Sequence, residues 1–261
     1  MRPLLFVSIL MSSMSSGCAF FAGPEGVEPS YASEADENVR RGQAALASRS
    51  FPQARKYFEH VRAKHPFLDA AIEAELGLAD ADFGNDQFAE ARERYTAFVK
   101  LHPSHSKVPY AAYRAALTFY KELPSDFFIL PPSYEKEQTE VKGAERAFDA
   151  FVRDYPKSEY LAEIKTLAIE VRLRLARHEL YAADFYDLRG KLPAVAGRLQ
   201  TLVDKYPGTV LEPSALLRLA NVYERLEKRE QAKGALQRLV DLHAGTSEAQ
   251  RARELLARAS P

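Results

Sequence analysis

Residues 91–103, ARERYTAFVKLHP, contain the pattern that decides the fold. Ala91 is followed by two large apolar residues, Tyr95 and Phe98, and then by Pro103. Apolar residues at offsets of four and seven lie on one face of a helix, and proline does not continue a helix. The stretch therefore predicts a helix that buries one face and ends before Pro103.

The same pattern occurs at four other places along the chain. These copies start at Ala54, Ala144, Val195 and Ala232, and the last has Ala244 in place of the proline. The starts lie 37 to 53 residues apart, a spacing typical of stacked helical hairpins. We therefore expect an all-α solenoid of five tetratricopeptide-like helical hairpins with a C-terminal capping helix.

Three irregular segments are also predicted. Residues 124–140, PSDFFILPPSYEKEQTE, form a loop inside the third hairpin, where Phe127-Phe128-Ile129 either pack against the hairpin or contact a partner. In the fourth copy Ser158 can cap a helix that continues to Gly190. At the end of the chain Ser247 and Gln250 fit a capping box for a helix ending near Ala259.

The N-terminus has the features of a secreted lipoprotein. Arg2 precedes an apolar run over residues 3–11, which is too short to span a bilayer. The only cysteine, Cys18, follows small residues, although Ser15 stands where a lipoprotein motif usually has leucine. We expect residues 1–17 to be a lipoprotein signal peptide, Cys18 to be lipidated and residues 18–33 to be a tether. The alternative is an ordinary cleaved secretory signal with an incidental cysteine.

Composition and motifs favour a binding protein over an enzyme. The net charge is zero, so nothing points to nucleic acid as a partner. The chain has none of the common motifs for catalysis or cofactor binding, and we expect no catalytic residue, cofactor or metal. Three of its six histidines occupy one repeat position, which they share with two tyrosines, so they fit the repeat rather than a metal site: His65, His102, Tyr155, Tyr206 and His243.

The chain resembles the BamD (ComL) family, the lipoprotein subunit of the machine that folds β-barrels into bacterial outer membranes. The resemblance rests on four stretches: residues 91–120, Glu137-Gln138-Thr139, the YPKSEY motif of residues 155–160, and the LARHE motif of residues 175–179 with the residues that follow it up to Arg198. Glu137 stands where the family often has aspartate.

The resemblance implies a location and a set of partners. The protein would sit on the outer membrane through its lipid anchor and face the periplasm. Its C-terminal repeats, residues 158–261, would dock the periplasmic domains of the central β-barrel subunit, beside other assembly lipoproteins. Its N-terminal repeats, residues 34–157, would receive the aromatic-rich targeting signals of unfolded outer-membrane proteins.

Candidate site residues follow for both halves. Tyr110, Tyr113 and Tyr120 share one arc of the helix expected over residues 108–123, and they either line an aromatic substrate groove or pack between repeats. The resemblance also suggests a partner-facing set, in which Arg198 could instead be a solvated helix charge: Arg177, Glu179, Arg189 and Arg198.

One other class of protein remains open on these grounds. Another periplasmic repeat lipoprotein, such as a secretin pilotin or a coordinator of cell-wall synthesis, would share the signal peptide and the repeats. Such a protein would not be expected to share the loop of the third hairpin or the long helix of the fourth.

Overall fold

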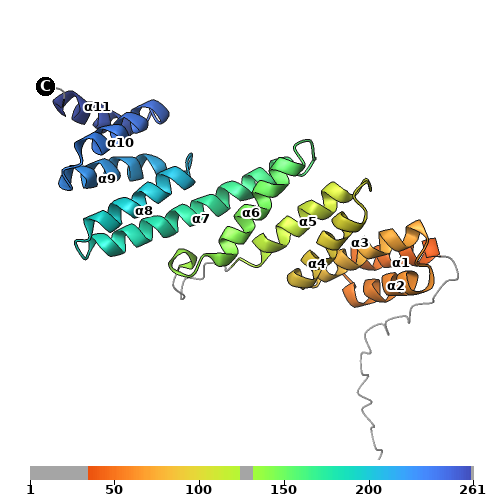
Figure 1. Ribbon diagram of the computed structural model, residues 1–261. Coiled ribbons are helices and arrows are strands. Elements are labelled where there is room, and N and C mark those ends of the chain that lie inside the picture. Colours follow the sequence, from red (N-terminus) through yellow and green to blue (C-terminus); the bar gives the residue numbers. More distant parts are fainter. Residues whose placement is uncertain (1–34, 124–131, 260–261) are drawn as a thin grey trace, which may run out of the picture.

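The computed structural model describes residues 35–123 and 132–259 (Figure 1). These residues form eleven α-helices and one 3₁₀ turn, η1 (Ser133–Glu135), and no β-strand. The helices are α1 (Ala35–Ala47), α2 (Phe51–Lys64), α3 (Asp69–Gly84), α4 (Phe88–Leu101), α5 (Val108–Lys121), α6 (Thr139–Asp154), α7 (Leu161–Asp187), α8 (Leu192–Lys205), α9 (Glu212–Arg225), α10 (Arg229–Leu242) and α11 (Ser247–Ala259).

Each helix packs against the next, which gives five antiparallel hairpins, α1/α2 to α9/α10, and the capping helix α11. The hairpins stack into an elongated solenoid (Figure 1), which confirms the predicted fold. All fifteen apolar positions of the repeat pattern are at most 5% exposed. They are Ala54, Phe58, Val61, Ala91, Tyr95, Phe98, Ala144, Phe148, Phe151, Val195, Leu199, Leu202, Ala232, Leu236 and Leu239.

The shared ring position ends the second helix of every hairpin. Each of these residues is the C-cap, and its backbone N–H donates to the carbonyl four residues earlier: His65, His102, Tyr155, Tyr206 and His243. Two of the histidines also reach carboxylates, with His102 Nε2 lying 2.9 Å from Glu75 and His243 Nε2 lying 3.1 Å from Glu212. Within the described part of the chain, no group of three or more metal-ligating side chains could hold a metal ion.

Glycine allows the closest approach between the first two hairpins. A Cβ added at Gly42 on α1 would come within 2.6 Å of the Phe58 ring, and one added at Gly77 on α3 within 2.4 Å. Because Phe58 is fully buried, its ring fills the space that the two missing Cβ atoms leave. Glycine at these two positions therefore sets how closely α1 and α3 approach α2.

Two predicted helix caps are wrong by one or two residues. Helix α7 begins at Leu161, and the Ser158 hydroxyl oxygen accepts a hydrogen bond from Tyr160 N–H at 3.2 Å in the turn before it. At α11 the capping side chain is Thr246, whose Oγ1 accepts from Ala249 N–H at 3.1 Å. The Ser247 hydroxyl instead donates to Glu248 at 2.9 Å. At α7 the N-cap position is Tyr160, whose backbone is itself helical (φ −81°, ψ −4°) and which makes no side-chain cap.

The direction of the helices gives the solenoid two distinct long edges. Helices α1, α3, α5, α7 and α9 run parallel, so each begins at the edge where the loops between hairpins lie. In Figure 1 the α4–α5, α6–α7 and α8–α9 loops follow one another along this edge, and the turns within hairpins lie along the other. We refer to the first as the inter-repeat edge.

Candidate functional site

A cluster of polar and aromatic side chains joins the second and third hairpins. Asp80 on α3 accepts hydrogen bonds from the hydroxyl of Tyr95 on α4, at 2.5 Å, and from that of Tyr110 on α5, at 2.7 Å. Arg114 Nε on α5 donates to Tyr95 Oη at 3.2 Å, and its guanidinium lies 3.7 Å from the centre of the Phe83 ring. Burial raises the pKa of Tyr95 and of Tyr110, and the Asp80 charge raises both further, so both phenols keep their protons and remain donors to Asp80.

A cavity with a volume of about 720 Å³ opens beside this cluster. It lies between α3, the start of α5 and the loop between α6 and α7. Two tyrosine rings and four charged groups supply its chemistry: Tyr110, Tyr160, Asp80, Glu159, Lys107 and Lys157. The two rings lie 5.9 Å apart between centroids. The cavity therefore combines aromatic surface with charges of both signs.

Tyr113 does not line this cavity but packs behind Tyr160, which does. Its ring stacks on Tyr160, with 4.4 Å between centroids and 12° between the planes. Burial raises the pKa of Tyr113 to about 12, with a further contribution from its hydrogen bond to Glu163. Of the tyrosines named from the sequence, Tyr110 lines the cavity and Tyr113 holds Tyr160 in place.

Tyr120 belongs to a second, smaller cavity of about 250 Å³. Its hydroxyl donates to Glu170 on α7 at 2.5 Å. Arg177 lines the same cavity. The cavity therefore contains one of the predicted substrate-binding tyrosines and one residue of the predicted partner-facing set. Tyr110 and Tyr120 share a helix face, but ten residues of helix, about 15 Å, separate them.

The 3₁₀ turn η1 is attached to α7 beside this cavity. His178 Nδ1 on α7 donates a hydrogen bond to the Tyr134 carbonyl of η1 at 2.6 Å.

The other residues of the predicted partner-facing set lie around the end of α7. Arg198 Nη1 on α8 lies 3.1 Å from Oε2 of Glu179, which is buried. Arg189 is exposed, donates to the Phe185 carbonyl at 2.8 Å and places its guanidinium 3.5 Å from the centre of the Phe185 ring. Leu188 beside it is 88% exposed. The C-terminal end of α7 therefore presents an exposed surface made of Phe185, Leu188 and Arg189.

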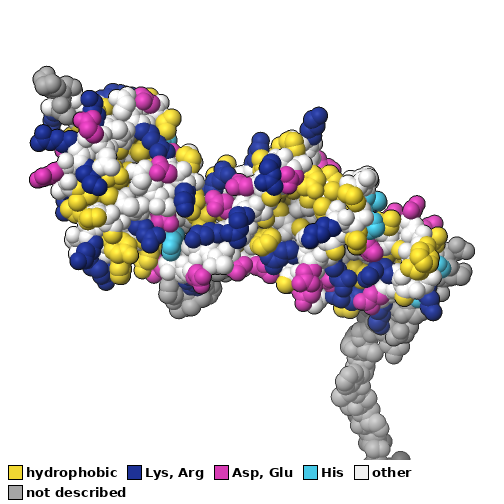
Figure 2. Space-filling model, viewed as in Figure 1, with side chains coloured by type: hydrophobic (Ala, Val, Ile, Leu, Met, Phe, Trp, Pro, Cys, Tyr) yellow, Lys and Arg dark blue, Asp and Glu magenta, His cyan; other side chains and the backbone are white. Residues whose placement is uncertain are grey.

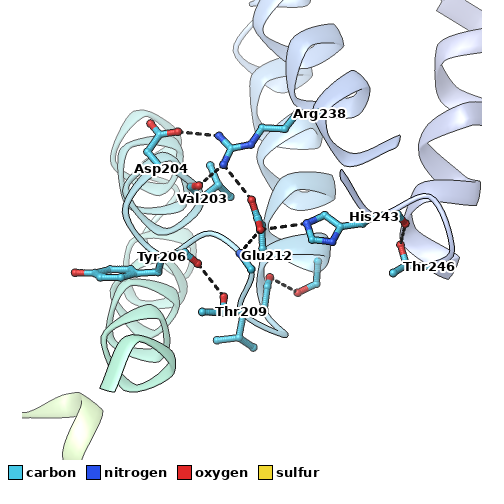
Figure 3. Close-up of polar contacts among 11 residues, drawn as sticks. Val203, Asp204, Tyr206, Thr209, Glu212, Arg238, His243 and Thr246 are labelled. Atoms are coloured by element: carbon cyan, nitrogen blue, oxygen red, sulfur yellow. Dashed lines mark hydrogen bonds and ion pairs between the residues drawn. The ribbon is translucent and has the colours of Figure 1, made fainter. Parts of the chain in front are cut away.

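A buried carboxylate on α9 holds the last two hairpins together (Figure 3). Glu212 is 1% exposed and accepts a hydrogen bond from Gly208 N–H at 2.6 Å. Arg238 on α10 donates to it at 3.0 Å, and also reaches Asp204 on α8 at 2.9 Å. His243 completes the group from the C-cap of α10. The network fixes the stacking of α8, α9 and α10.

An apolar groove of about 270 Å³ lies between α4, α5 and α6. On the face drawn in Figure 2, hydrophobic side chains gather over α5 and α6. Arg92 closes one side, with its guanidinium 4.0 Å from the centre of the Phe119 ring. Small residues of α5 and α6 make the groove possible: Ala112, Ala115, Ala116, Ala147 and Ala150.

Sequence reasoning missed the residues that complete the large cavity. Asp80, Lys107, Lys157 and Tyr160 come from three separate stretches, and only the stacking of hairpins brings them together. Tyr160 does occur in the YPKSEY stretch noted above. Cys18 and Phe127-Phe128-Ile129 lie outside the described residues. Among the described helices, none is long and apolar enough to cross a membrane.

Several known proteins are similar to this chain. An outer membrane protein assembly factor BamD of Neisseria meningitidis serogroup B is 30% identical over 207 residues, which cover 77% of this chain and 73% of that protein. The factor of the same name from Caulobacter vibrioides is 25% identical over 240 residues, or 89% of this chain and 73% of that one. A solved tetratricopeptide-repeat protein of Thermus thermophilus covers 86% of this chain and 100% of its own, with 16% identity and a TM-score of 0.35.

A family model described as YfiO, outer membrane lipoprotein, matches residues 32–239. That range takes in all of the first four hairpins and most of the fifth. The match over most of the chain, together with the BamD relatives, shows that the chain belongs to the BamD (YfiO) family of outer membrane lipoproteins.

Proposed function

We propose that this protein is a non-catalytic scaffold subunit of the machine that assembles β-barrel proteins in the outer membrane. Its family membership and the names of its relatives support this role. Cys18 would carry the lipid that holds the chain on the inner leaflet, facing the periplasm. A solenoid suits the role because it offers extended surfaces to several partners at once.

The N-terminal half, residues 34–157, together with the turn that precedes α7, would bind the targeting signals of unfolded outer-membrane proteins. The observation that carries this proposal is the cavity of about 720 Å³ between the second, third and fourth hairpins. Tyr110 and Tyr160 offer ring faces to aromatic side chains. Lys107 and Lys157, which are both exposed, suit the carboxylate at the end of a peptide chain.

Peptide binding tests this assignment. A fluorescent peptide that copies the aromatic C-terminus of an outer-membrane β-barrel protein is titrated with the protein, and anisotropy gives Kd. Lys107→Ala with Lys157→Ala should raise Kd on the order of ten-fold, since both cations would leave the bound carboxylate. Lys142→Ala, an exposed lysine on α6, is the matched control and should leave Kd unchanged. Equal Kd values for all these variants would show that the cavity does not hold the signal.

The C-terminal half, residues 158–261, would dock the central barrel subunit through the surface that ends α7. Aromatic rings and arginine, here Phe185 and Arg189, are the side chains that interfaces favour at their centres, and Leu188 adds exposed apolar surface beside them. Leu188→Glu should reduce recovery of the barrel subunit when the protein is captured from detergent extracts through a C-terminal tag. Ile169→Glu, at a residue of α7 that is 62% exposed, serves as the control.

The same capture experiment separates the two classes of lipoprotein. Recovery of a barrel subunit with large periplasmic domains, in near-equal amount, supports the assembly-machine proposal. Recovery of a secretin or a peptidoglycan synthase without such a barrel would replace it with the pilotin or cell-wall alternative.

A further inference from the structure

The inter-repeat edge carries exposed apolar side chains at its N-terminal end. Phe67 and Leu68, in the loop between α2 and α3, are 98% and 51% exposed, and Leu101 at the end of α4 is 67% exposed. Large apolar side chains exposed singly are common, but here three lie in or beside two consecutive loops of one edge. We call Phe67, Leu68 and Leu101 the apolar tips.

The fold itself holds the apolar tips outward. In the first loop His65 N–H donates to the Val61 carbonyl at 2.8 Å, and Leu68 N–H donates back to the His65 carbonyl at 3.2 Å. This turn leaves Phe67 at its apex. In the second loop the rings of His102 and His105 pack on Phe98, at 5.1 and 5.3 Å between centroids. The histidines occupy the inner side of the loop, and Leu101 remains outside.

Exposed cations lie close to the apolar tips along the chain. Arg62, Lys64 and Lys100 are exposed, and none forms an ion pair within the part of the chain that the structure describes. Asp69, the first residue of α3, is the acidic residue next to the first loop. Apolar side chains flanked by lysine and arginine match the surface of a bilayer, where acyl chains lie beneath anionic phosphates.

The path of the chain leads to the same edge. Helix α1 runs parallel to α3, so Ala35 lies at the edge where α3 begins, which is also the edge of the loop that carries Phe67 and Leu68. The sixteen residues between Cys18 and Ala35 can span at most about 55 Å. This step rests on the lipidation of Cys18 proposed above. An anchored chain would therefore hold the apolar tips close to the membrane.

We propose that the apolar tips, with Arg62, Lys64 and Lys100, contact the anionic phospholipid surface of the membrane that carries the lipid anchor. The Phe67 ring enters the interface between headgroups and acyl chains, and the three cations pair with phosphates. A single anchor point would not by itself orient the solenoid on the membrane. This second contact fixes one edge of the first two hairpins on the membrane and turns the other edge toward the periplasm.

Tryptophan fluorescence tests the contact directly, because the chain contains no tryptophan. The processed, lipidated chain carrying Phe67→Trp is reconstituted into vesicles of phosphatidylethanolamine and phosphatidylglycerol, with or without brominated acyl chains. We expect emission at shorter wavelength and quenching by bromine at least about two-fold stronger than for Ile169→Trp on α7. Adding Lys64→Glu and Lys100→Glu, or omitting phosphatidylglycerol, should reduce the quenching.

These experiments separate membrane binding through the lipid on Cys18 from membrane binding through the apolar tips. The difference in vesicle flotation between wild type and Cys18→Ser reports the contribution of the anchor. If the wild type floats but Phe67→Trp is quenched no more than Ile169→Trp, the edge proposal is overturned and the lipid anchor stands. If the fluorescence of Phe67→Trp changes only when the purified barrel subunit is added, the apolar tips bind protein instead, which also overturns the proposal. Flotation of Cys18→Ser that depends on Phe67 would support the edge without the anchor.

Discussion

Arg198 Nη1 lies 3.1 Å from Oε2 of Glu179, and this ion pair joins α8 to the long helix α7. The Glu179 side chain is 9% exposed and that of Arg198 is 41% exposed, so the pair sits where the hairpin meets solvent. The hydrogen bond to Glu179 raises the pKa of Arg198. Both residues were expected to face a partner; the structure pairs them with each other, and docking through them stays a prediction.

The first prediction is that Arg198→Glu destabilises the fold, because it breaks this ion pair. The new carboxylate would lie beside the buried Glu179, and we expect the free energy of unfolding to fall by about 2 kcal/mol. Urea unfolding followed by circular dichroism measures the change. Arg198→Gln, which removes the cation without adding an anion, should cost about half as much. Equal midpoints for Arg198→Glu and wild type would show that the pair does not hold the hairpin.

A second prediction concerns the contact between the first two hairpins. In Gly77→Ala the added Cβ would overlap the buried Phe58 ring, and we expect a loss of about 1–3 kcal/mol. The matched control is Gly234→Ala on α10, where an added Cβ meets nothing within 4 Å. Because alanine favours helix more than glycine does, this control should gain about 0.5–1 kcal/mol. A gain in both variants would contradict the close packing at Phe58.

A third prediction concerns the buried carboxylate between the last two hairpins. Glu212→Ala leaves the Arg238 guanidinium and the Gly208 N–H without this acceptor. We expect a loss of about 3 kcal/mol, concentrated in α10 and α11 because hairpin stacks fray from their ends. Hydrogen exchange read by mass spectrometry should show faster exchange there than in α1 to α5. Uniform acceleration along the whole chain would contradict this local role.

The fourth prediction is a pH dependence from Asp80. Burial raises the pKa of Asp80, while the hydrogen bonds from Tyr95 and Tyr110 lower it in part. Since a raised pKa means that the folded state disfavours the ionised carboxyl, stability should fall as the pH rises from about 4, the ordinary range of aspartate, through the higher folded value. Asp80→Asn should lack this fall. Urea midpoints that run parallel for both proteins across that window would refute the assignment.

The repeat pattern was enough to predict the architecture. Offsets of four and seven depend only on helix geometry, so Phe58, Tyr95 and Phe148 could be placed in the core from the sequence. The start of α7 at Leu161 was missed because its N-cap residue, Tyr160, has a helical backbone and makes no side-chain cap, so no capping motif marks it. At α11, Thr246 and Ser247 are neighbours, and the sequence does not tell which of them is the cap.

The candidate site was only partly predictable. Tyr110, Tyr113 and Tyr120 share one helix face, and this periodicity could be read from the sequence. Which of them lines the large cavity depends on residues of other hairpins, since Tyr160 covers Tyr113 and Tyr120 bonds to Glu170 of α7 in a separate cavity. Such contacts depend on how neighbouring hairpins stack, and the sequence pattern within one helix does not predict which residues of other hairpins will lie beside it.

Helix α7 has a mechanical consequence for the whole molecule. It begins next to Tyr160 in the large cavity and ends, 27 residues later, at the exposed surface around Leu188. A helix of that length measures about 40 Å, and its two ends move together when it tilts as a rigid body. A tilt of about 5° around one end would move the other by about 3.5 Å. A tilt too small to change the packing around Tyr160 would therefore displace the surface around Leu188 by more than the length of a C–C bond.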